Sequence, residues 1–278
     1  MRNSAGTIAD AVCSIQLQTL TDWELIVIDD GSSDQCASIV RAFNDVRIRL
    51  VCEAAQAGLA TRLNQAIALS RGAYIARMDA DDVCFPDRLE RQVARLEREP
   101  QLDLLGCGAV VFAGDGRLIG ELPIGLTHDE ITAQPFRGFP FPHPTWCGRA
   151  DWFRKNPYDA NLMKTQDQDL LLRTFARSRF AALEDVLIGY RQDALDLAKM
   201  LLGRRVFIGS LWRYARHSRE FLPAFEGIAI HLLKSGTDIV TIGLGLNRLV
   251  QRNRLKPVRP TVARQWQDLQ KHLSKGLG

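Results

Sequence analysis

The sequence has few cysteines, and their arrangement suits neither a metal site nor a disulfide framework. Six cysteines are scattered over 278 residues, with no Cys-x-x-Cys pair and no histidines at a matching spacing. This pattern argues against a structural zinc site and against a secreted, disulfide-stabilised fold. We therefore expect a protein of a reducing compartment.

Long apolar runs are also missing. The start of the chain, Met1 to Ala5, has no apolar core of the kind that a signal peptide carries. No uncharged run approaches the roughly 20 residues that a membrane-spanning helix needs. The longest late candidate, Ile239 to Asn247, is short and contains two glycines. These absences predict a cytoplasmic protein.

Charge is distributed unevenly along the chain. From Arg173 to the end there are 19 Lys and Arg against 8 Asp and Glu, whereas the earlier part has 17 against 24. The basic end would form a solvated surface, or contact anionic lipid headgroups at the inner face of a membrane or a lipid-diphosphate acceptor. No nucleic-acid-binding module accompanies it, so we expect no nucleic-acid partner.

A short apolar stretch, Tyr74 to Met78, leads directly into three carboxylates, Asp79, Asp81 and Asp82. At the end of a strand, carboxylates so spaced can hold Mg²⁺ or Mn²⁺ while phosphate oxygens complete its coordination. The carboxylates would repel one another, and a divalent cation would relieve that repulsion. The simpler interpretation is an Asp-rich turn that caps the following helix.

A second apolar stretch, Trp23 to Ile28, ends in Asp29 and Asp30 and is followed by Gly and Ser. Two strands that end in acids, with a helix between them, predict an α/β sheet. In such sheets ligands bind at the carboxyl ends of the strands. Both acidic stretches are therefore candidates for one ligand site.

Together these stretches resemble family 2 of the inverting nucleotide-sugar glycosyltransferases, which have the GT-A fold. The resemblance covers roughly Arg2 to Arg191. Asp29–Asp34 resembles the family's nucleotide-contacting motif, and Gly58–Asn64 with Arg71–Ala76 resembles the helix and strand that lead to its metal site. Met78–Asp82 resembles the metal-binding Asp-x-Asp, and Pro86–Gln92 resembles the helix after it.

The resemblance implies a Rossmann-like GT-A domain over residues 1–191, with a mostly parallel sheet flanked by helices. A basic helical extension would follow over residues 192–278. Members of the family normally begin with an apolar strand that ends in Pro and Asn. Arg2 and Asn3 resemble the end of that motif, and the strand itself is not in this sequence. Two interpretations are open: the start is placed too late, or the nucleotide pocket is defective.

The resemblance also implies catalytic and metal-binding residues. Asp167 matches the proposed base of the family's Glu-Asp-x-Asp-Leu stretch, where Gln166 replaces the usual Glu, and Asp169 is the second choice or a substrate contact. Both acids would alternatively stabilise a helix N-terminus. Asp81 is the expected direct ligand of the divalent cation, and Asp79 a ligand or a ribose contact.

Further residues are candidates for substrate binding. Asp30 is expected to accept from a nucleobase N–H, with Asp29 beside it. Asn64 would contact the pocket or pack its helix, and His143 would touch the metal or the sugar or be structural. Arg62 or Arg77 would bind phosphate, or form ordinary ion pairs. Trp146 and Trp152 would stack on a sugar or, more simply, fill the core.

Hydrophobic periodicity predicts the regular elements. The predicted helices are Asn3–Thr19, Ser33–Phe43, Gly58–Ser70, Pro86–Glu99, Thr165–Arg177, Leu195–Leu211, Leu222–Lys234, Asp238–Gln251 and Val262–Leu273. The predicted strands are Trp23–Ile28, Val46–Cys52, Ala73–Met78, Leu102–Phe112 and Arg117–Leu122. Residues 134–146 are predicted to form an irregular active-site loop.

The sequence thus predicts an inverting, metal-dependent glycosyltransferase. It would move a sugar from a nucleotide-diphosphate donor, UDP-linked as first choice, to a hydroxyl of a surface glycan or lipid-linked acceptor. The alternative is a non-catalytic nucleotide-binding or scaffold protein on the same fold, which the missing first strand favours. A nucleotidyltransferase would need a Gly-rich phosphate loop after its first strand, and no such loop is present.

Overall fold

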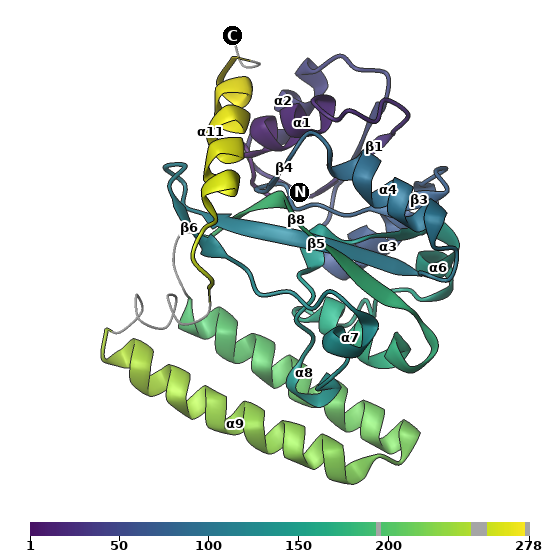
Figure 1. Ribbon diagram of the computed structural model, residues 1–278, viewed down its shortest axis with the longest axis vertical. Helices are drawn as coiled ribbons and strands as arrows, with labels where there is room; N and C mark the ends of the chain where they lie inside the picture. Colours follow the sequence, from purple (N-terminus) through teal and green to yellow (C-terminus); the bar gives the residue numbers. More distant parts are fainter. Residues whose placement is uncertain (193–195, 246–254, 276–278) are drawn as a thin grey trace.

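A six-stranded mixed sheet runs through the middle of the molecule (Figure 1). The computed structural model describes residues 1–192, 196–245 and 255–275. Across the sheet the strands lie in the order β3 (Tyr74–Ala76), β7 (Cys147–Arg149), β5 (Leu104–Phe112), β8 (Phe180–Arg191) and β4 (Val83–Cys84), and β6 (Leu118–Glu121) pairs with β5.

Two further strands, β1 (Leu25–Asp30) and β2 (Ile48–Glu53), form a separate parallel pair. The first residue of the chain lies along the other edge of β1. The Met1 ammonium donates to the Ile28 carbonyl at 2.6 Å, and the Asp30 amide donates to the Met1 carbonyl at 3.0 Å. Met1 therefore continues the hydrogen bonding of this sheet next to the acidic end of β1.

The α/β class is confirmed, but the prediction of a mostly parallel sheet is wrong. Among the strand pairs of the described ranges, β1–β2 and β5–β8 are parallel, and the other four are antiparallel. Part of the reason is local, because β5 and β6 are joined by a tight turn that cannot connect parallel strands. The other antiparallel pairs, β3–β7, β5–β7 and β4–β8, join distant segments through β7 and the long central strand β8, neither of which the sequence predicted.

Helices cover the sheet where their apolar residues point inward. The N-terminal part contributes α1 (Ile8–Gln16), α2 (Cys36–Ala42), α3 (Leu59–Leu69) and α4 (Arg88–Arg98). Later come α5 (His128–Ile131), α6 (Ala150–Lys155), α7 (Gln166–Thr174) and the 3₁₀ turns η1 (Pro135–Arg137), η2 (His143–Thr145) and η3 (Phe175–Arg177). Every residue of β5 is buried, as expected for a strand covered on both faces.

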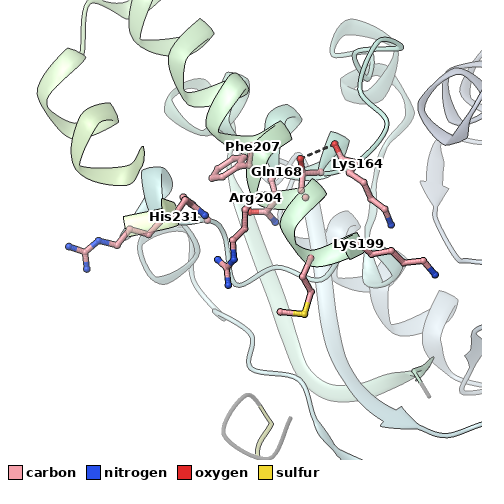
Figure 2. A pocket seen from close by; sticks show the side chains of 11 residues that line it. Lys164, Gln168, Lys199, Arg204, Phe207 and His231 are labelled. Carbon is pink, nitrogen blue, oxygen red and sulfur yellow. Dashed lines mark hydrogen bonds between the residues drawn. The ribbon is translucent and has the colours of Figure 1, made fainter. Parts of the chain in front are cut away.

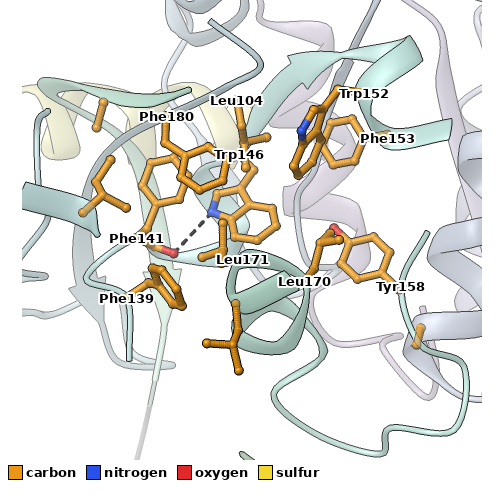
Figure 3. Close-up of a cluster of buried hydrophobic side chains, with 14 of the residues drawn as sticks. Leu104, Phe139, Phe141, Trp146, Trp152, Phe153, Tyr158, Leu170, Leu171 and Phe180 are labelled. Carbon is orange, nitrogen blue, oxygen red and sulfur yellow. Dashed lines mark hydrogen bonds between the residues drawn. The ribbon is translucent and has the colours of Figure 1, made fainter. Parts of the chain in front are cut away.

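The largest core cluster is aromatic and lies between the sheet and α7 (Figure 3). Trp146 is fully buried, and its indole N–H donates to the Phe141 carbonyl at 3.2 Å. Trp152 is buried as well, and its indole donates to the Ser178 hydroxyl at 2.8 Å. Both tryptophans therefore fill the core, which leaves no face free to stack on a sugar.

The C-terminal part begins with an antiparallel hairpin of α8 (Leu197–Ser218) and α9 (Phe221–Gly243), which lies to one side of the sheet (Figure 1). The prediction of two helices over Leu222–Lys234 and Asp238–Gln251 is wrong, because α9 continues through Gly236. Contacts with α8 along its length hold α9 together, and a single glycine costs a helix only about 1 kcal/mol. The end of the second predicted helix lies outside the described residues.

The last helix, α11 (Pro260–Lys275), returns to the first part of the chain (Figure 1). Its Trp266 is buried against Phe112, with ring centroids 4.6 Å apart. The division into residues 1–191 and 192–278 stays a prediction, and α11 packs into the core of the first part. Of the helices that the structure describes, none combines the length and hydropathy that a membrane crossing requires.

Candidate active site

Three carboxylates converge in the turn between β3 and β4. Asp79, Asp81 and Asp82 each place an oxygen within 4.8 Å of the others. Asp82 is fully buried; its Oδ1 accepts from the Arg191 amide at 2.9 Å, whereas its Oδ2 has no hydrogen-bond partner. A buried carboxylate oxygen without a partner is costly, so this atom indicates a position for a ligand.

The electrostatics of this cluster favour a cation. Burial raises the pKa of Asp82 well above its ordinary value, and the charge of Asp79 adds to the effect. Desolvation and Asp79 likewise raise the pKa of Asp81. Carboxylate oxygens are the ligands that Mg²⁺ and Mn²⁺ prefer, and a divalent cation would remove the mutual repulsion. The residues present therefore fit a divalent metal ion.

Arg77 lies at the centre of the surrounding charges. Its side chain is buried and forms an ion pair with Asp79, while its Nε and Nη1 have no hydrogen-bond partner. Its charge opposes protonation of His143 and lowers the pKa of Asp167 against the effect of burial. The ion pair that the sequence left open is present, and two guanidinium donors remain for an anion.

His143 and Tyr158 form a buried pair beside Arg77. The Nε2 of His143 and the hydroxyl of Tyr158 are 2.8 Å apart, and the imidazole also packs edge-on against Trp146. Burial, followed by the nearby charge of Arg77, keeps the pKa of His143 well below its ordinary value. His143 is therefore neutral at neutral pH. No sequence motif marked Tyr158, which only the tertiary contact reveals.

Asp167 lies in the first turn of α7. Its side chain is half-buried, and burial raises its pKa above the ordinary value, although Gln168 and Arg77 oppose the shift. Gln168 also fixes the start of α7, because its Oε1 accepts from the Phe139 amide at 2.8 Å. Burial raises the pKa of Tyr158, and the charges of Asp167 and Asp79 add to the effect, so the two acids act on the same buried side chain.

Asp169 is close to Asp167 in sequence but faces other partners. Its carboxylate is buried, with Arg173 Nε at 2.8 Å and Arg213 Nη2 at 3.3 Å. Arg213 belongs to α8, so this ion pair fastens α7 to the C-terminal hairpin. Both oxygens are engaged within the protein, an arrangement typical of a positioning residue.

Asp30, at the end of β1, holds the loop that precedes α3. It accepts from the Ala57 and Gly58 amides at 2.7 and 2.9 Å and from Arg62 Nε at 2.7 Å. Burial alone would raise the pKa of Asp30, but these hydrogen bonds outweigh it and lower that pKa. Arg62 is therefore in an ion pair, the second of the two interpretations that the sequence left open.

Asp29 shapes the turn after β1, since its Oδ1 accepts from the amide and hydroxyl of Ser32.

Asn64, on α3, forms two hydrogen bonds with the backbone of Tyr158. Its Nδ2 donates to the Tyr158 carbonyl at 2.8 Å, and its Oδ1 accepts from the Tyr158 amide at 2.9 Å. Asn64 thus fixes the residue that contacts His143.

A groove of about 330 Å³ opens beside the start of α7 (Figure 2). Lys164, Thr165 and Gln168 line one side of it, and α8 and α9 line the other with Lys199, Arg204, Phe207 and His231. A neighbouring groove of about 530 Å³ shares Gln168 and is lined also by Lys234. The grooves therefore carry cationic side chains next to the turn that holds Asp167.

Comparisons with known proteins agree with this geometry. Residues 1–156 match the family model described as glycosyl transferase family 2. The chain is 34% identical over 199 residues to the putative glycosyltransferase EpsE of Bacillus subtilis, covering 69% of this chain and 70% of EpsE. Over 94 residues it is 36% identical to the Escherichia coli UDP-Glc:alpha-D-GlcNAc-diphosphoundecaprenol beta-1,3-glucosyltransferase WfgD, covering 34% of this chain and 37% of WfgD.

Solved structures with the same fold share little sequence with this chain. Staphylococcus aureus TarS 1–349 in complex with UDP-GlcNAc superposes with a TM-score of 0.62 at 16% identity, covering 100% of this chain and 80% of TarS 1–349. This chain spans 38% of a longer TarS chain. The mannosyltransferase PcManGT of Pyrobaculum calidifontis, in complex with GDP-Man and Mn²⁺, superposes with a TM-score of 0.58 at 16% identity, covering 99% of this chain and 83% of PcManGT.

Proposed function

The chain belongs to glycosyl transferase family 2, and from this premise we propose that it is an inverting, metal-dependent enzyme. It transfers a sugar from a UDP-sugar to a hydroxyl of a glycan or lipid-linked acceptor in polysaccharide synthesis. Membership of the family, together with the carboxylate cluster, favours this activity over a non-catalytic scaffold role.

The observation that carries the proposal is the convergence of two acidic groups on Arg77 and Tyr158. Asp79 and Asp82 of the cluster influence Arg77, and Asp79 and Asp167 both influence Tyr158. A donor diphosphate and an acceptor hydroxyl need opposite electrostatic environments within one site. Arg77 and a cation on the cluster would supply the positive environment, and Asp167 would supply the negative one.

The cluster would hold the donor end of the reaction. A divalent cation held by Asp79, Asp81 and Asp82 would neutralise part of the negative charge of the leaving diphosphate. Arg77 would donate its unpartnered Nε–H and Nη1–H groups to an anionic oxygen of the substrate. Support for a metal comes from the Asp cluster and from the Mn²⁺ of the PcManGT complex.

Asp167 would act on the acceptor. The carboxylate removes the proton from the acceptor hydroxyl as the oxygen attacks the anomeric carbon, and the bond from that carbon to the diphosphate breaks with its electrons on phosphate. Attack opposite the leaving group inverts the anomeric configuration. Burial brings the pKa of Asp167 closer to neutral, as suits a general base.

The groove beside α7 would receive the acceptor. Lys164 and Lys199 line it, and a phosphate-bearing acceptor would complement their charge. The names of WfgD and of the TarS complex support a UDP-sugar donor, and that of WfgD supports a diphosphate-lipid acceptor. Such an acceptor would bring the basic C-terminal helices to a membrane surface.

The test is a titration of the purified chain with UDP, GDP, CDP and dTDP, each with and without Mn²⁺. We expect Mn²⁺-dependent binding of UDP, measured calorimetrically, and transfer of labelled sugar from a matching UDP-sugar. Binding of GDP in place of UDP would refute the donor assignment. Equal binding of UDP after removal of all divalent cations would refute the metal-dependent mechanism.

A further inference from the structure

The outer surface of the α8–α9 hairpin is unusually apolar. Across the described ranges, most exposed large hydrophobic side chains lie on this hairpin or directly after it. They are Trp212, Phe221, Leu222, Phe225, Leu232, Leu233, Ile239, Val240 and Leu244, whereas Val46, Leu59 and Met163 lie elsewhere. Scattered apolar residues are normal on a surface, but a continuous group of this kind indicates a contact surface.

The polarity of α9 is reversed relative to a helix that faces water. Its buried side includes the polar residues His231 and Asp238, and Asp238 is paired with Arg204 of α8. At about 100° per residue, the exposed apolar side chains of α9 fill an arc of about 120°. We call this arc the α9 face; it consists of Phe221, Leu222, Phe225, Ala229, Leu232, Leu233, Gly236, Ile239, Val240 and Gly243. A surface helix normally turns its apolar stripe toward the core.

Acidic residues are scarce along the α9 face. Glu226 lies at its margin, and its carboxylate forms an ion pair with Arg137. The uncharged surface therefore extends over the length of α9, about 34 Å for 23 residues.

Cations border the α9 face on the side of α8. The antiparallel register is fixed by the Arg204–Asp238 ion pair and by the ring contact between Trp212 and Phe225 at 5.7 Å. In that register the exposed Arg205, one residue after Arg204, lies next to the turn of Gly236. The exposed Arg216 lies next to the N-terminal end of α9 by the same alignment. An apolar helix face bordered by cations complements the interface of an anionic bilayer.

A second copy of the chain fits this surface less well. A strip about 34 Å long and roughly 10 Å wide offers about 340 Å² per chain, less than half of the ~800 Å² per partner in a stable protein interface. The bordering arginines would also repel their counterparts in a symmetric pair. Size and charge both favour lipid.

We propose that the α9 face lies in the interfacial layer of an anionic lipid bilayer, with Arg205 and Arg216 directed at lipid phosphates. The helix lies along the membrane surface and does not cross it. This inference deepens the proposed function by naming the surface that contacts the membrane. The groove beside α7 is lined by the opposite side of the same two helices, so docking places it about one helix diameter, roughly 10 Å, from the lipid surface.

The experiment is flotation of the full chain with acceptor-free vesicles of phosphatidylcholine, alone or mixed with phosphatidylglycerol. We expect the chain to float with the mixed vesicles, and the double variant Leu232→Ser/Val240→Ser to bind about tenfold more weakly. Val46→Ser is the matched control, because Val46 is fully exposed at a distant site and its loss leaves binding unchanged. Arg205→Ala/Arg216→Ala weakens the preference for phosphatidylglycerol.

Two outcomes would overturn the inference. One is a flotation result in which the parent chain does not bind vesicles, or in which Leu232→Ser/Val240→Ser binds as well as Val46→Ser. The other is a dimer in sedimentation that Leu232→Ser/Val240→Ser converts to a monomer while vesicle binding is unaffected. Leu232→Ser/Val240→Ser and Val46→Ser should both keep the melting temperature of the parent chain, because the replaced side chains are largely exposed.

The result separates cleanly from the proposed activity. UDP binding in the presence of Mn²⁺ is measured without vesicles, and Leu232→Ser/Val240→Ser should leave it unchanged. If vesicle binding depends on the α9 face while no nucleotide binds, the membrane inference stands and the proposed function fails. If UDP binds and no variant affects flotation, the membrane inference fails and the proposed function stands.

Discussion

The imidazole Nε2 of His143 lies 2.8 Å from the hydroxyl of Tyr158, inside the protein and beside Arg77. Asn64 holds the backbone of Tyr158 with two hydrogen bonds, although the two residues are 94 positions apart. A neutral imidazole, a phenol and an amide from three separate segments are thus joined by hydrogen bonds. Arg77 and Asp167 act electrostatically on this group, and its contribution to stability can be tested.

Replacement of Asp167 by Asn should lower the rate of sugar transfer by roughly 10²–10⁴-fold, because an amide cannot accept the acceptor proton. UDP binding should stay within about twofold of the parent value, since the proposed metal and phosphate contacts belong to Asp79, Asp81 and Arg77. Transfer of labelled sugar and calorimetry measure the two effects. Asp151→Asn, which changes an exposed acid on α6, serves as the control. Near-normal turnover of Asp167→Asn would show that another group is the base.

Replacement of Asp81 by Ala should abolish the Mn²⁺-dependent rise in melting temperature that UDP produces. The remaining carboxylates would bind the cation more weakly, because one oxygen ligand is lost. Thermal denaturation with UDP, with and without Mn²⁺, provides the measurement. Asp87→Ala, at the start of α4, removes an acid outside the cluster and should leave the rise intact. An unchanged rise in Asp81→Ala would exclude this residue as a ligand.

Replacement of Asn64 by Ala should destabilise the protein by about 1–3 kcal/mol. It removes both partners of the Tyr158 backbone and leaves a partly buried amide and carbonyl unsatisfied. Tyr158→Phe removes only the hydroxyl contact with His143 and should cost about 1 kcal/mol. Urea unfolding would compare the two variants with the parent. If Asn64→Ala cost no more than Tyr158→Phe, the backbone contact would not be important for stability.

His231 should make the hairpin sensitive to acid. Burial, helped by Lys234 and Arg204, lowers the pKa of His231 from 6.5 to about 4. The unfolded chain therefore binds a proton between pH 6.5 and 4 that the folded chain excludes. Stability is complete above pH 6.5 and falls by about 2–3 kcal/mol as the pH drops to 4.

Urea unfolding between pH 7 and 4 would show this loss. His231→Phe should reduce the slope, and His272→Phe, at an exposed position on α11, should keep it. A slope that is unaffected by His231→Phe would assign the acid sensitivity to other groups.

Local features of the site could be predicted from the sequence. Asp79, Asp81 and Asp82 are neighbours in the chain, so a single turn is enough to bring their oxygens together. The apolar stretches before the two acidic motifs likewise became strands, Leu25–Asp30 and Tyr74–Ala76, because β structure in a covered sheet follows from short apolar runs. These elements depend on spacing within a few residues.

Other features were decided by contacts between distant segments. The central strand β8, the antiparallel pairing of most strands and the bond between His143 and Tyr158 join parts of the chain that no local pattern relates. The same holds for α9, because the helical spacing of its apolar residues predicts a stripe but not the direction in which it faces. Packing against α8 and η1 buried His231 and Asp238 and turned the apolar side outward. The sequence by itself therefore determined the carboxylate cluster and the apolar spacing of α9, and the tertiary structure decided that α9 is continuous and what each of them faces.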